Sequence, residues 1–489
     1  MKTEQTKLVI IAAGPAGLAA AITAVEEGLD AKDLIVLEKT QMTGGTANMG
    51  MGPLGVETRQ QRERLMGVTR EKAFEEFMTY THWRSNSLLV KKYIDMSADT
   101  IEWLEGMGVV FEPSRMFEDS EPTWHYVIPD DGGAPGPRAA STMFRRMTER
   151  ASQMGIRILL ETWATSLRKE EEKITGVYAK NAQGEEFLFE CKAAIIATGG
   201  FASDHEMMKK YTGYTYGVDM YSYEGTALTG DGIKMAWEVG AAPTEMHMEL
   251  NYRIPDNLGH FAIDAVMRQP NLMVNLFGER FFNEGILGNG TFATNAIDQQ
   301  KDRQCFIIMD ESIKKHYAAH GLDLISVVHG AGIMDEFDKD CEAALAEGYK
   351  HFFKADTIEE LCRQTGISYE GLSATIEEYN DDCEGGRDTL FNKNYRYMKP
   401  LKKGPYYAAR FCVAAYGSLG GIKINHKTEV IRKDFTPIEG LYAAGSDTCD
   451  IFGDSYVFLL PGNTMGYALN SGRMAGEAAA DFIARGEKE

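Results

Sequence analysis

The sequence predicts an α/β fold on three observations. A short β-branched run at 7–12 is followed by a glycine-containing turn, an alanine-rich helical run and a second apolar run at 34–37. Further short apolar runs come late, at 193–197 and 441–445, and the stretch 335–380 between them is charged and helical in pattern. A strand–turn–helix–strand unit of this kind is typical of a Rossmann-like domain. We therefore expect a Rossmann-like nucleotide-binding domain made from both ends of the chain, with an inserted α+β cap domain.

The change in pattern along the chain sets the expected boundaries. We expect the first part of the nucleotide-binding domain at 1–245, the cap at 246–412 and the second part of the nucleotide-binding domain at 413–489. The remaining elements follow from short apolar runs bounded by polar or glycine residues. They are strands at 156–160 and 176–180, an isolated strand at 305–309 and a closing helix at 464–484.

Composition excludes several classes of protein. The chain has 489 residues, enough for two or three domains, and its 51 basic against 72 acidic side chains give a net charge of −21. An acidic surface argues against nucleic acid or an anionic membrane as partner. The seven cysteines form no Cys-x-x-Cys pair, so we expect no zinc, iron–sulfur or other metal site. No apolar stretch reaches ~18 residues, and no signal peptide is visible, so we expect a cytoplasmic protein.

The first turn carries most of a dinucleotide-binding motif. Ala12 stands where the first glycine usually lies, and we expect the turn to form with a negative φ at Ala12. Gly14 lets backbone approach a diphosphate, and Gly17 lets the helix pack closely on the strand. Glu38 lies 21 residues beyond Gly17, at the end of the second strand, and is expected to accept both ribose hydroxyls.

Three further turns indicate a long cofactor, and therefore FAD in preference to NAD. A glycine-rich turn follows Glu38, and two more glycine turns end strands far along the chain. No second Gly-x-Gly-x-x-Gly follows a strand, so a separate NAD domain of that type is not expected. The residues concerned in the three turns are Gly44, Gly45 and Thr46; Thr198 and Gly199; and Gly445 and Asp447.

Five motifs carry a resemblance to a known family. They are TGGFASDHEMMKKY at 198–211, TGDGIKMAWEVGA at 229–241, GERFFNE at 278–284, GSLGGIKIN at 417–425 and GLYAAGSD at 440–447. In this order they resemble the fumarate reductase and succinate dehydrogenase flavoprotein superfamily. The resemblance implies an FAD domain split by a mobile cap, with substrate held between the cap and the isoalloxazine ring.

The resemblance also implies a set of FAD contacts. Members that attach FAD covalently do so through a histidine after the second strand, and 40–56 contains none, so we expect non-covalent binding. The start of the last helix is expected to face the flavin, where its N–H groups favour negative charge. The expected contacts are Ala12, Gly14, Ala16, Gly17, Glu38, Lys39, Gly44, Gly45, Thr46, Ala164, Thr198, Gly199, Asp231, Gly445, Asp447, Asn463, Thr464 and Met465.

The expected substrate site departs from this family. In the resembling enzymes, an arginine four residues after the motif glutamate delivers a proton, and here that position is Gly288. A second arginine position holds Leu459, and the two histidine positions match Gly417 and Tyr252. A carboxylate left without these cations would cost several kcal/mol. We therefore expect a small neutral organic substrate and no dicarboxylate.

Phenols and two arginines are the candidates for chemistry in this site. Tyr252, Tyr416 and Tyr456 are expected to line it, because phenolic hydroxyls can donate hydrogen bonds or a proton. Arg253 and Arg268 lie in the cap segment, where either can replace a lost arginine. Arg280 and the histidines His247 and His260 are expected to be structural.

The sequence favours an enzyme over a flavin electron carrier, because no haem or cluster partner is encoded. We expect an FAD-dependent reductase that moves hydride from flavin N5 to a neutral multi-ring oxygenated substrate, on a CH–CH or benzylic C–O group. The run from Ala444 to Glu477 is similar to reductases of anaerobic gut bacteria, which suggests isoflavonoid metabolism, such as tetrahydrodaidzein to equol. A 3-ketosteroid reductase or dehydrogenase remains the alternative. The sequence does not fix the electron donor, and NAD(P)H, a free flavin and a small protein all stay candidates.

Overall fold

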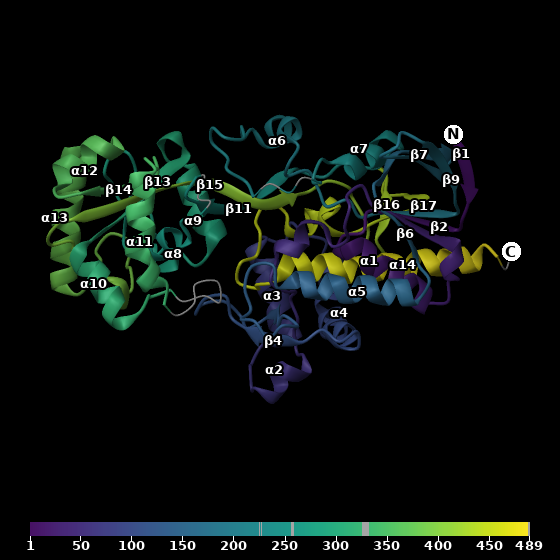
Figure 1. Ribbon diagram of the computed structural model, residues 1–489, viewed down its shortest axis with the longest axis horizontal. Coiled ribbons are helices and arrows are strands. Elements are labelled where there is room, and N and C mark those ends of the chain that lie inside the picture. The colour runs from purple at the N-terminus through teal and green to yellow at the C-terminus, as the bar shows by residue number, and fades with distance from the viewer. Residues whose placement is uncertain (224, 226, 256–258, 325–331, 488–489) are drawn as a thin grey trace.

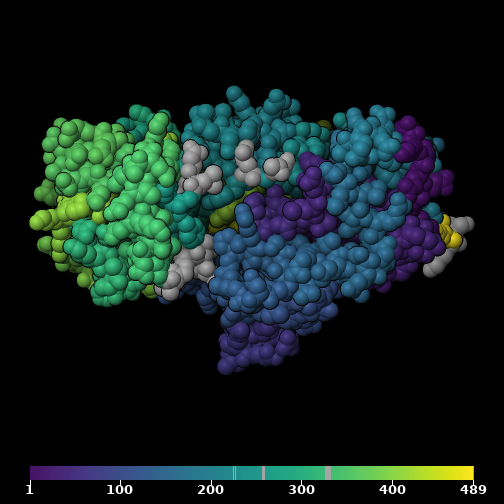
Figure 2. All heavy atoms as spheres, in the orientation of Figure 1, coloured from purple at the N-terminus to yellow at the C-terminus, as the bar shows by residue number. Residues whose placement is uncertain are grey.

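A computed structural model describes residues 1–223, 225, 227–255, 259–324 and 332–487 of the chain (Figure 1). The larger part, which we call the main domain, contains both termini at one end of an elongated molecule, and the cap lies at the other end. Figure 2 shows the surface hollowed between teal and blue atoms near the middle of the molecule, beside the green cap. The predicted α/β fold with an inserted α+β cap is confirmed.

The main domain is built on a sheet that contains ten strands among the described residues. The four central strands pair in parallel, with Leu8 opposite Leu34 and Ala193 opposite Leu8. β2, β3 and β10 are short aliphatic strands in which every residue is buried, as expected where helices cover both faces of a parallel sheet. In sheet order the strands are β1 Lys2–Gln5, β9 Glu186–Glu190, β8 Lys173–Asn181, β17 Pro437–Ala443, β10 Ala193–Ile196, β2 Leu8–Ile11, β3 Leu34–Leu37 and β6 Arg157–Leu159, with β16 Glu429–Ile431 beside β17 and β7 Thr162–Glu170 beside β8.

Two helices from opposite ends of the chain pack side by side below this sheet. They are α1 (Pro15–Glu26) and α14 (Asn463–Arg485), with α5 (Ala140–Gln153) next to them in Figure 1. A Cβ on Gly472 would lie 2.3 Å from the carbonyl oxygen of Ala16, and one on Gly476 would lie 2.4 Å from that of Ala20. The two helix backbones approach this closely because both positions are glycine, so the C-terminal helix fixes the turn that precedes α1.

The cap is a second α+β unit. Its sheet pairs β11 His247–Arg253, β15 Tyr406–Leu419, β13 Gln304–Asp310 and β12 Leu272–Val274 in order, with β14 Phe352–Ala355 also on β15. The strand expected to be isolated at 305–309 is instead β13, antiparallel to both β15 and β12; its partners are distant in sequence, so its own residues do not reveal them. The cap helices are α8 Phe261–Met267, α9 Gly290–Asp298, α10 Glu311–His320, α11 Ile333–Ala346, α12 Ile358–Thr365 and α13 Tyr369–Gly385.

β15 connects the cap to the main domain. It runs through residue 412, where a boundary was expected, and continues to Leu419 beside the main domain (Figure 1). The division into 1–245, 246–412 and 413–489 therefore stays a proposal. No helix of the described residues is long and apolar enough to cross a membrane. The main domain is completed by α2 Arg59–Glu63, α3 Arg70–Tyr80, α4 Ser87–Glu105, α6 His205–Thr212, α7 Asp231–Glu238 and the hairpin strands β4 Phe111–Ser114 and β5 Trp124–Val127.

Candidate active site

The turn between β2 and α1 is tight and strained. Ala12 has φ 85°, so the expected negative φ is wrong. A left-handed backbone costs an L-residue roughly 1–2 kcal/mol, which is why glycine is usual at this place. A Cβ on Gly17 would lie 1.8 Å from the Ala12 carbonyl oxygen. The close approach of helix to strand therefore requires glycine at 17, as the motif predicts.

A second glycine turn closes over the first. Gly44 and Gly45 have φ 88° and 54°, and the Gly44 N–H donates to the Ala13 carbonyl at 2.8 Å. A Cβ on Gly45 would lie 3.8 Å from the Gly14 Cα. The two turns thus present bare backbone to each other at the N-terminus of α1, where helix N–H groups favour an anion. This is a cradle suited to a diphosphate.

Glu38 and Lys39 hold the rim of this cradle. The buried Glu38 carboxylate accepts hydrogen bonds from the Ala13 N–H at 2.8 Å and from the Thr40 N–H and hydroxyl at 2.8 and 2.7 Å. A carboxylate has about four acceptor positions, so capacity remains for a ribose hydroxyl. Lys39 Nζ contacts Asp231 Oδ2 at 2.9 Å. Two residues that are 192 positions apart, and that were both expected at the cofactor, therefore meet.

The two strand-end turns expected at the cofactor are joined through Asp447. Its buried carboxylate accepts from the Thr198 hydroxyl at 2.9 Å and from the Gly199 and Gly200 N–H groups at 3.2 and 3.0 Å, and also from the Thr198 N–H. Burial raises the pKa of Asp447, and these hydrogen bonds oppose that shift. The side chain expected to touch FAD thus holds the 198–200 turn in shape.

The start of α14 carries an unsatisfied polar group. Asn463 Oδ1 accepts from the Tyr93 hydroxyl at 2.8 Å, whereas its buried Nδ2 has no hydrogen-bond partner. Such an orphan is expected where a ligand supplies the acceptor. The unpaired Asn463 Nδ2 and the glycine cradle together fit an FAD that extends from the β2–α1 turn to the start of α14. Met465 follows in the same turn, packing near Gly50, and Ala164 is buried in β7.

A cavity of about 120 Å³ lies between the cap and the main domain. Its walls are mainly aromatic and aliphatic, with one arginine–aspartate pair. Gly288 is part of the wall, so the position that holds an arginine in the resembling family offers no charge here. The described lining residues are Met116, Phe117, Tyr223, Asn251, Tyr252, Phe261, Asp264, Arg268, Gln269, Leu287, Gly288, Gly290, Leu324, Tyr416 and Phe458.

Arg268 and Asp264 form an ion pair in the cavity wall. Arg268 Nε lies 2.7 Å from Asp264 Oδ2, and the two side chains are 15% and 14% exposed. Burial by itself lowers the pKa of Arg268, but the Asp264 carboxylate and the neighbouring Tyr252 and Tyr223 phenols together outweigh it and hold that pKa above its ordinary value. The guanidinium lies 4.6 Å from the centre of the Tyr252 ring. The cavity thus contains a cation whose charge is already balanced.

The expected phenols have different environments. Tyr252 lines the cavity with its ring, but its hydroxyl donates to the Leu287 carbonyl at 3.1 Å, and burial raises its pKa to about 12. Tyr416 also lines the cavity, is 42% exposed, and stacks on Tyr223 at 5.1 Å. Desolvation raises the pKa of Tyr223 and also that of Tyr416, although the Tyr416 residue as a whole is partly exposed. These hydroxyls therefore stay protonated at neutral pH and act as donors.

Two of the expected catalytic residues lie outside the described cavity wall. Tyr456 is buried, and its hydroxyl accepts from the Thr464 N–H at 3.3 Å. Arg253 stacks on Tyr223, with its guanidinium 4.3 Å from the ring centre. Each contacts a residue of the cavity wall, Tyr456 through its ring 5.1 Å from that of Phe458 and Arg253 through Tyr223, and their catalytic roles stay predictions. Tyr223 itself was missed by sequence reasoning, because it lies in an irregular segment with no motif, and Phe117 was missed for the same reason.

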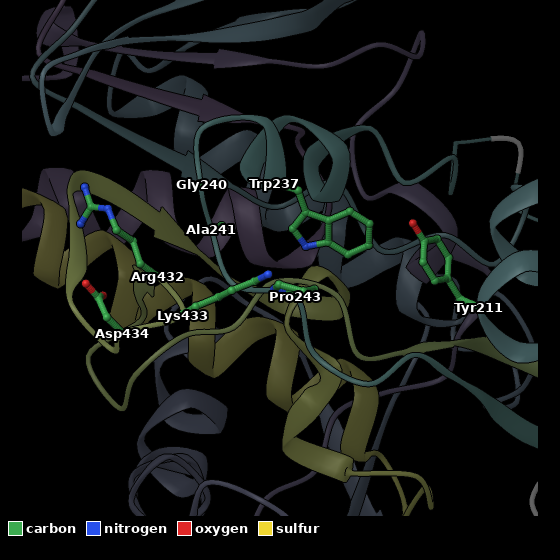
Figure 3. A pocket seen from close by; sticks show the side chains of 8 residues that line it. All are labelled: Tyr211, Trp237, Gly240, Ala241, Pro243, Arg432, Lys433 and Asp434. Atoms are coloured by element: carbon green, nitrogen blue, oxygen red, sulfur yellow. The ribbon is translucent and has the colours of Figure 1, made fainter.

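A larger hollow of about 660 Å³ opens on the main domain near α7, and its described lining residues are all different from those of the cavity. Figure 3 shows Lys433 reaching toward Pro243 and Trp237, whereas Arg432 points away from Trp237. Arg432 is already paired with Glu172. Among the described residues, no cluster of side chains is arranged to hold a metal ion.

Comparison with known proteins agrees with this geometry. The profile of the family described as FAD binding domain matches residues 7–464. A vinyl phenol reductase of Lactiplantibacillus plantarum is 32% identical, over 98% of this chain and 97% of that protein. An NADH:fumarate oxidoreductase of Klebsiella pneumoniae is 28% identical, over 97% of this chain and 47% of that protein.

Solved structures extend the likeness to the three-dimensional fold. The open conformation of a flavocytochrome c3 fumarate reductase superposes with a TM-score of 0.71 at 25% identity, over 98% of this chain and 79% of that one. The glycine cradle, the orphaned Asn463 amide and the matched families point to the same cofactor, FAD. The chain belongs to the FAD-binding domain family, and it is an FAD-dependent oxidoreductase of the fumarate reductase and succinate dehydrogenase flavoprotein superfamily.

Proposed function

We propose that this protein reduces the carbon–carbon double bond of a neutral compound with one phenolic ring. The observation that carries the proposal is the cavity between cap and main domain, with its aromatic walls, its phenolic hydroxyls and its balanced ion pair. Bound FAD supplies hydride, and a proton from the protein completes the addition of two hydrogens. NAD(P)H is the proposed electron donor, supported by the name of the NADH:fumarate oxidoreductase relative.

The charge of the cavity supports a neutral substrate. Among the described lining residues, Arg268 is the cation, and Asp264 sits 2.7 Å from it. A dicarboxylate would enter with two negative charges and meet no net positive charge, so its desolvation would stay uncompensated. The vinyl phenol reductase relative is named for a substrate class that needs no such cations.

The size of the cavity supports one ring. Its volume is about 120 Å³, somewhat below the about 150 Å³ of a protein cavity known to hold benzene, so a single phenolic ring needs only a slight widening of the cavity. Tetrahydrodaidzein has three rings and a steroid has four, so both would require a much larger movement of the cap. The isoflavonoid and steroid substrates therefore stay predictions that rank below a single phenolic ring.

Tyr416 and Tyr223 are the proposed proton donor and its support. Tyr416 lines the cavity, its hydroxyl is protonated at neutral pH, and Tyr223 stacks on its ring at 5.1 Å. Desolvation and Tyr223 raise the pKa of Tyr416, and the Arg268 charge partly opposes them, so the hydroxyl holds its proton until the substrate takes it. Tyr252, whose hydroxyl is bonded to Leu287, serves as an aromatic wall.

The test of the substrate class is anaerobic reoxidation of the photoreduced enzyme. 4-Vinylphenol should reoxidise the flavin promptly and yield 4-ethylphenol, whereas fumarate should not. Reoxidation by tetrahydrodaidzein or by a 3-keto-4-ene steroid, with none by 4-vinylphenol, would overturn the single-ring proposal. Reoxidation by fumarate alone would overturn the neutral substrate. Reoxidation only by a redox protein would identify an electron carrier.

The test of the proton donor is the Tyr416→Phe variant. It should lower kcat for 4-vinylphenol by 10²-fold or more, the usual contribution of a general acid, and leave hydride transfer from NADH to FAD unchanged. Tyr395→Phe is the matched control, since Tyr395 is 62% exposed in the cap. A Tyr416→Phe enzyme with the kcat of the control would exclude Tyr416 as the donor.

A further inference from the structure

Glu249 is a buried carboxyl that the proposed reduction does not use. It lies in β11, is 4% exposed, and sits where the register with β15 shifts between Met248 and Leu250. At this irregularity, Glu249 faces both Tyr416 and Gly417. Bulges of this kind re-aim side chains and are frequent beside active sites. A Cβ on Gly417 would lie 3.0 Å from Glu249 Oε2, so the missing side chain leaves room for the carboxyl.

The side-chain hydrogen bond of Glu249 joins it to the start of α14. Its Oε1 accepts a hydrogen bond from the Thr464 hydroxyl at 2.8 Å. Thr464 is in the first turn of that helix, and its N–H donates to the Tyr456 hydroxyl at 3.3 Å. The unpaired Nδ2 of Asn463 is one residue away. The Glu249 carboxyl therefore contacts the start of α14, the helix end proposed to face the flavin. The irregularity between β11 and β15 at Glu249 also includes Tyr416, which lines the cavity.

Within the described part of the chain, no cation balances this carboxyl. Among the described residues, no Lys, Arg or His nitrogen lies within ion-pair distance of Glu249. The ionisable groups that face it are Tyr416 of β15 and Cys449 and Tyr456 of the loop before α14, all neutral near pH 7; His247 lies two positions away on β11. Burial raises the pKa of Glu249 to about 7, and the Thr464 hydrogen bond opposes this. Glu249 thus changes charge in the physiological range.

We propose that Glu249, acting through Thr464, is a positioning residue that couples proton uptake by the protein to electron uptake by the bound FAD. Reduction adds negative charge at the flavin, which strengthens proton binding at a nearby carboxyl. By linkage, the protonated carboxyl favours the reduced cofactor to the same extent. The inference rests on FAD binding and is independent of the substrate proposed above.

The test is the midpoint potential of the bound FAD, measured by spectroelectrochemistry from pH 5 to 9. In the wild-type holoenzyme, the potential should fall more steeply with pH from near pH 7, because one additional proton is taken up on reduction. Glu249→Gln should remove this steeper segment. Glu245→Gln is the matched control, because it makes the same change at a 72% exposed side chain four residues away, and it should keep the segment.

Other outcomes overturn the proposal. A steeper segment that persists in Glu249→Gln would belong to the flavin itself, and a wild-type profile without any steeper segment would also refute the coupling. If Glu249→Gln does not retain FAD, Thr464→Val decides. Loss of that hydrogen bond should move the segment to higher pH, because the bond stabilises the ionised carboxylate. An unmoved segment in Thr464→Val would contradict action through Thr464.

Discussion

Replacement of Asp264 by asparagine should change which charge the cavity accepts. The Arg268 guanidinium, 2.7 Å from Asp264 in the wild type, would keep its charge and lose its counterion. Two unit charges at 4 Å interact by about 4 kcal/mol at an effective dielectric constant of 20. Residual hydration and the cost of ordering the pair reduce this, and a net effect of about 1.4–2.8 kcal/mol corresponds to roughly 10- to 100-fold in affinity.

The assay compares two substrates of the same ring. The ratio of kcat/KM for 4-hydroxycinnamate, a carboxylate, to that for 4-vinylphenol should rise roughly 10- to 100-fold in Asp264→Asn. The variant should also unfold more easily, by up to about 3 kcal/mol, because a partly buried cation is left unpaired. Asp381→Asn, an exposed change in α13, is the control for net charge. An unchanged ratio in Asp264→Asn would refute the view that this ion pair sets the charge preference.

Three further outcomes are expected at the cofactor site. Glu38→Ala should lose FAD on gel filtration, since its hydrogen bonds to backbone and ribose are worth about 1.5–3 kcal/mol each; retention of the full flavin absorbance would contradict this role. Ala12→Gly should raise the free energy of unfolding by roughly 1 kcal/mol, by relieving its φ of 85°, which thermal unfolding of the holoenzyme measures. The folded-state pKa of Glu249 is raised from 4.5 to about 7. Between these two pH values the folded protein therefore binds more protons than the unfolded chain, and the free energy of unfolding falls as pH rises. The wild type should lose up to about 3 kcal/mol relative to Glu249→Gln between pH 4.5 and 8, and parallel pH–stability curves would show that Glu249 titrates normally.

The sequence by itself determined the cofactor and the frame that holds it. Short strands buried on both faces and glycines at fixed spacing are local patterns, and each has one geometry that satisfies it. The close packing at Gly17 could therefore be predicted from spacing alone, and the same spacing placed Glu38 beside this turn, where it accepts from the Ala13 N–H. The closing helix was predicted at 464–484 and observed at Asn463–Arg485. The failure at Ala12 has a physical reason, since its φ is imposed by β2, α1 and the Gly44 turn together.

Only the tertiary structure decided the cavity between the cap and the main domain. Its wall combines the cap strand β11, helix α8 and residues such as Tyr223 and Phe117 from irregular segments of the main domain. No spacing rule relates positions that are joined by packing alone. The Tyr252 hydroxyl donates to the backbone carbonyl of Leu287, 35 positions away, so the environment of a tyrosine in this wall depends on neighbours that are distant in sequence.

The charge of the cavity was decided in the same way. The sequence showed that the expected arginine positions hold Gly288 and Leu459, and it offered Arg268 as a replacement. It could not show that Asp264, one helical turn earlier, neutralises Arg268, because the same spacing on a solvated helix would be a weak surface pair. Burial strengthens the attraction between Arg268 and Asp264, and burial is a property of the folded molecule.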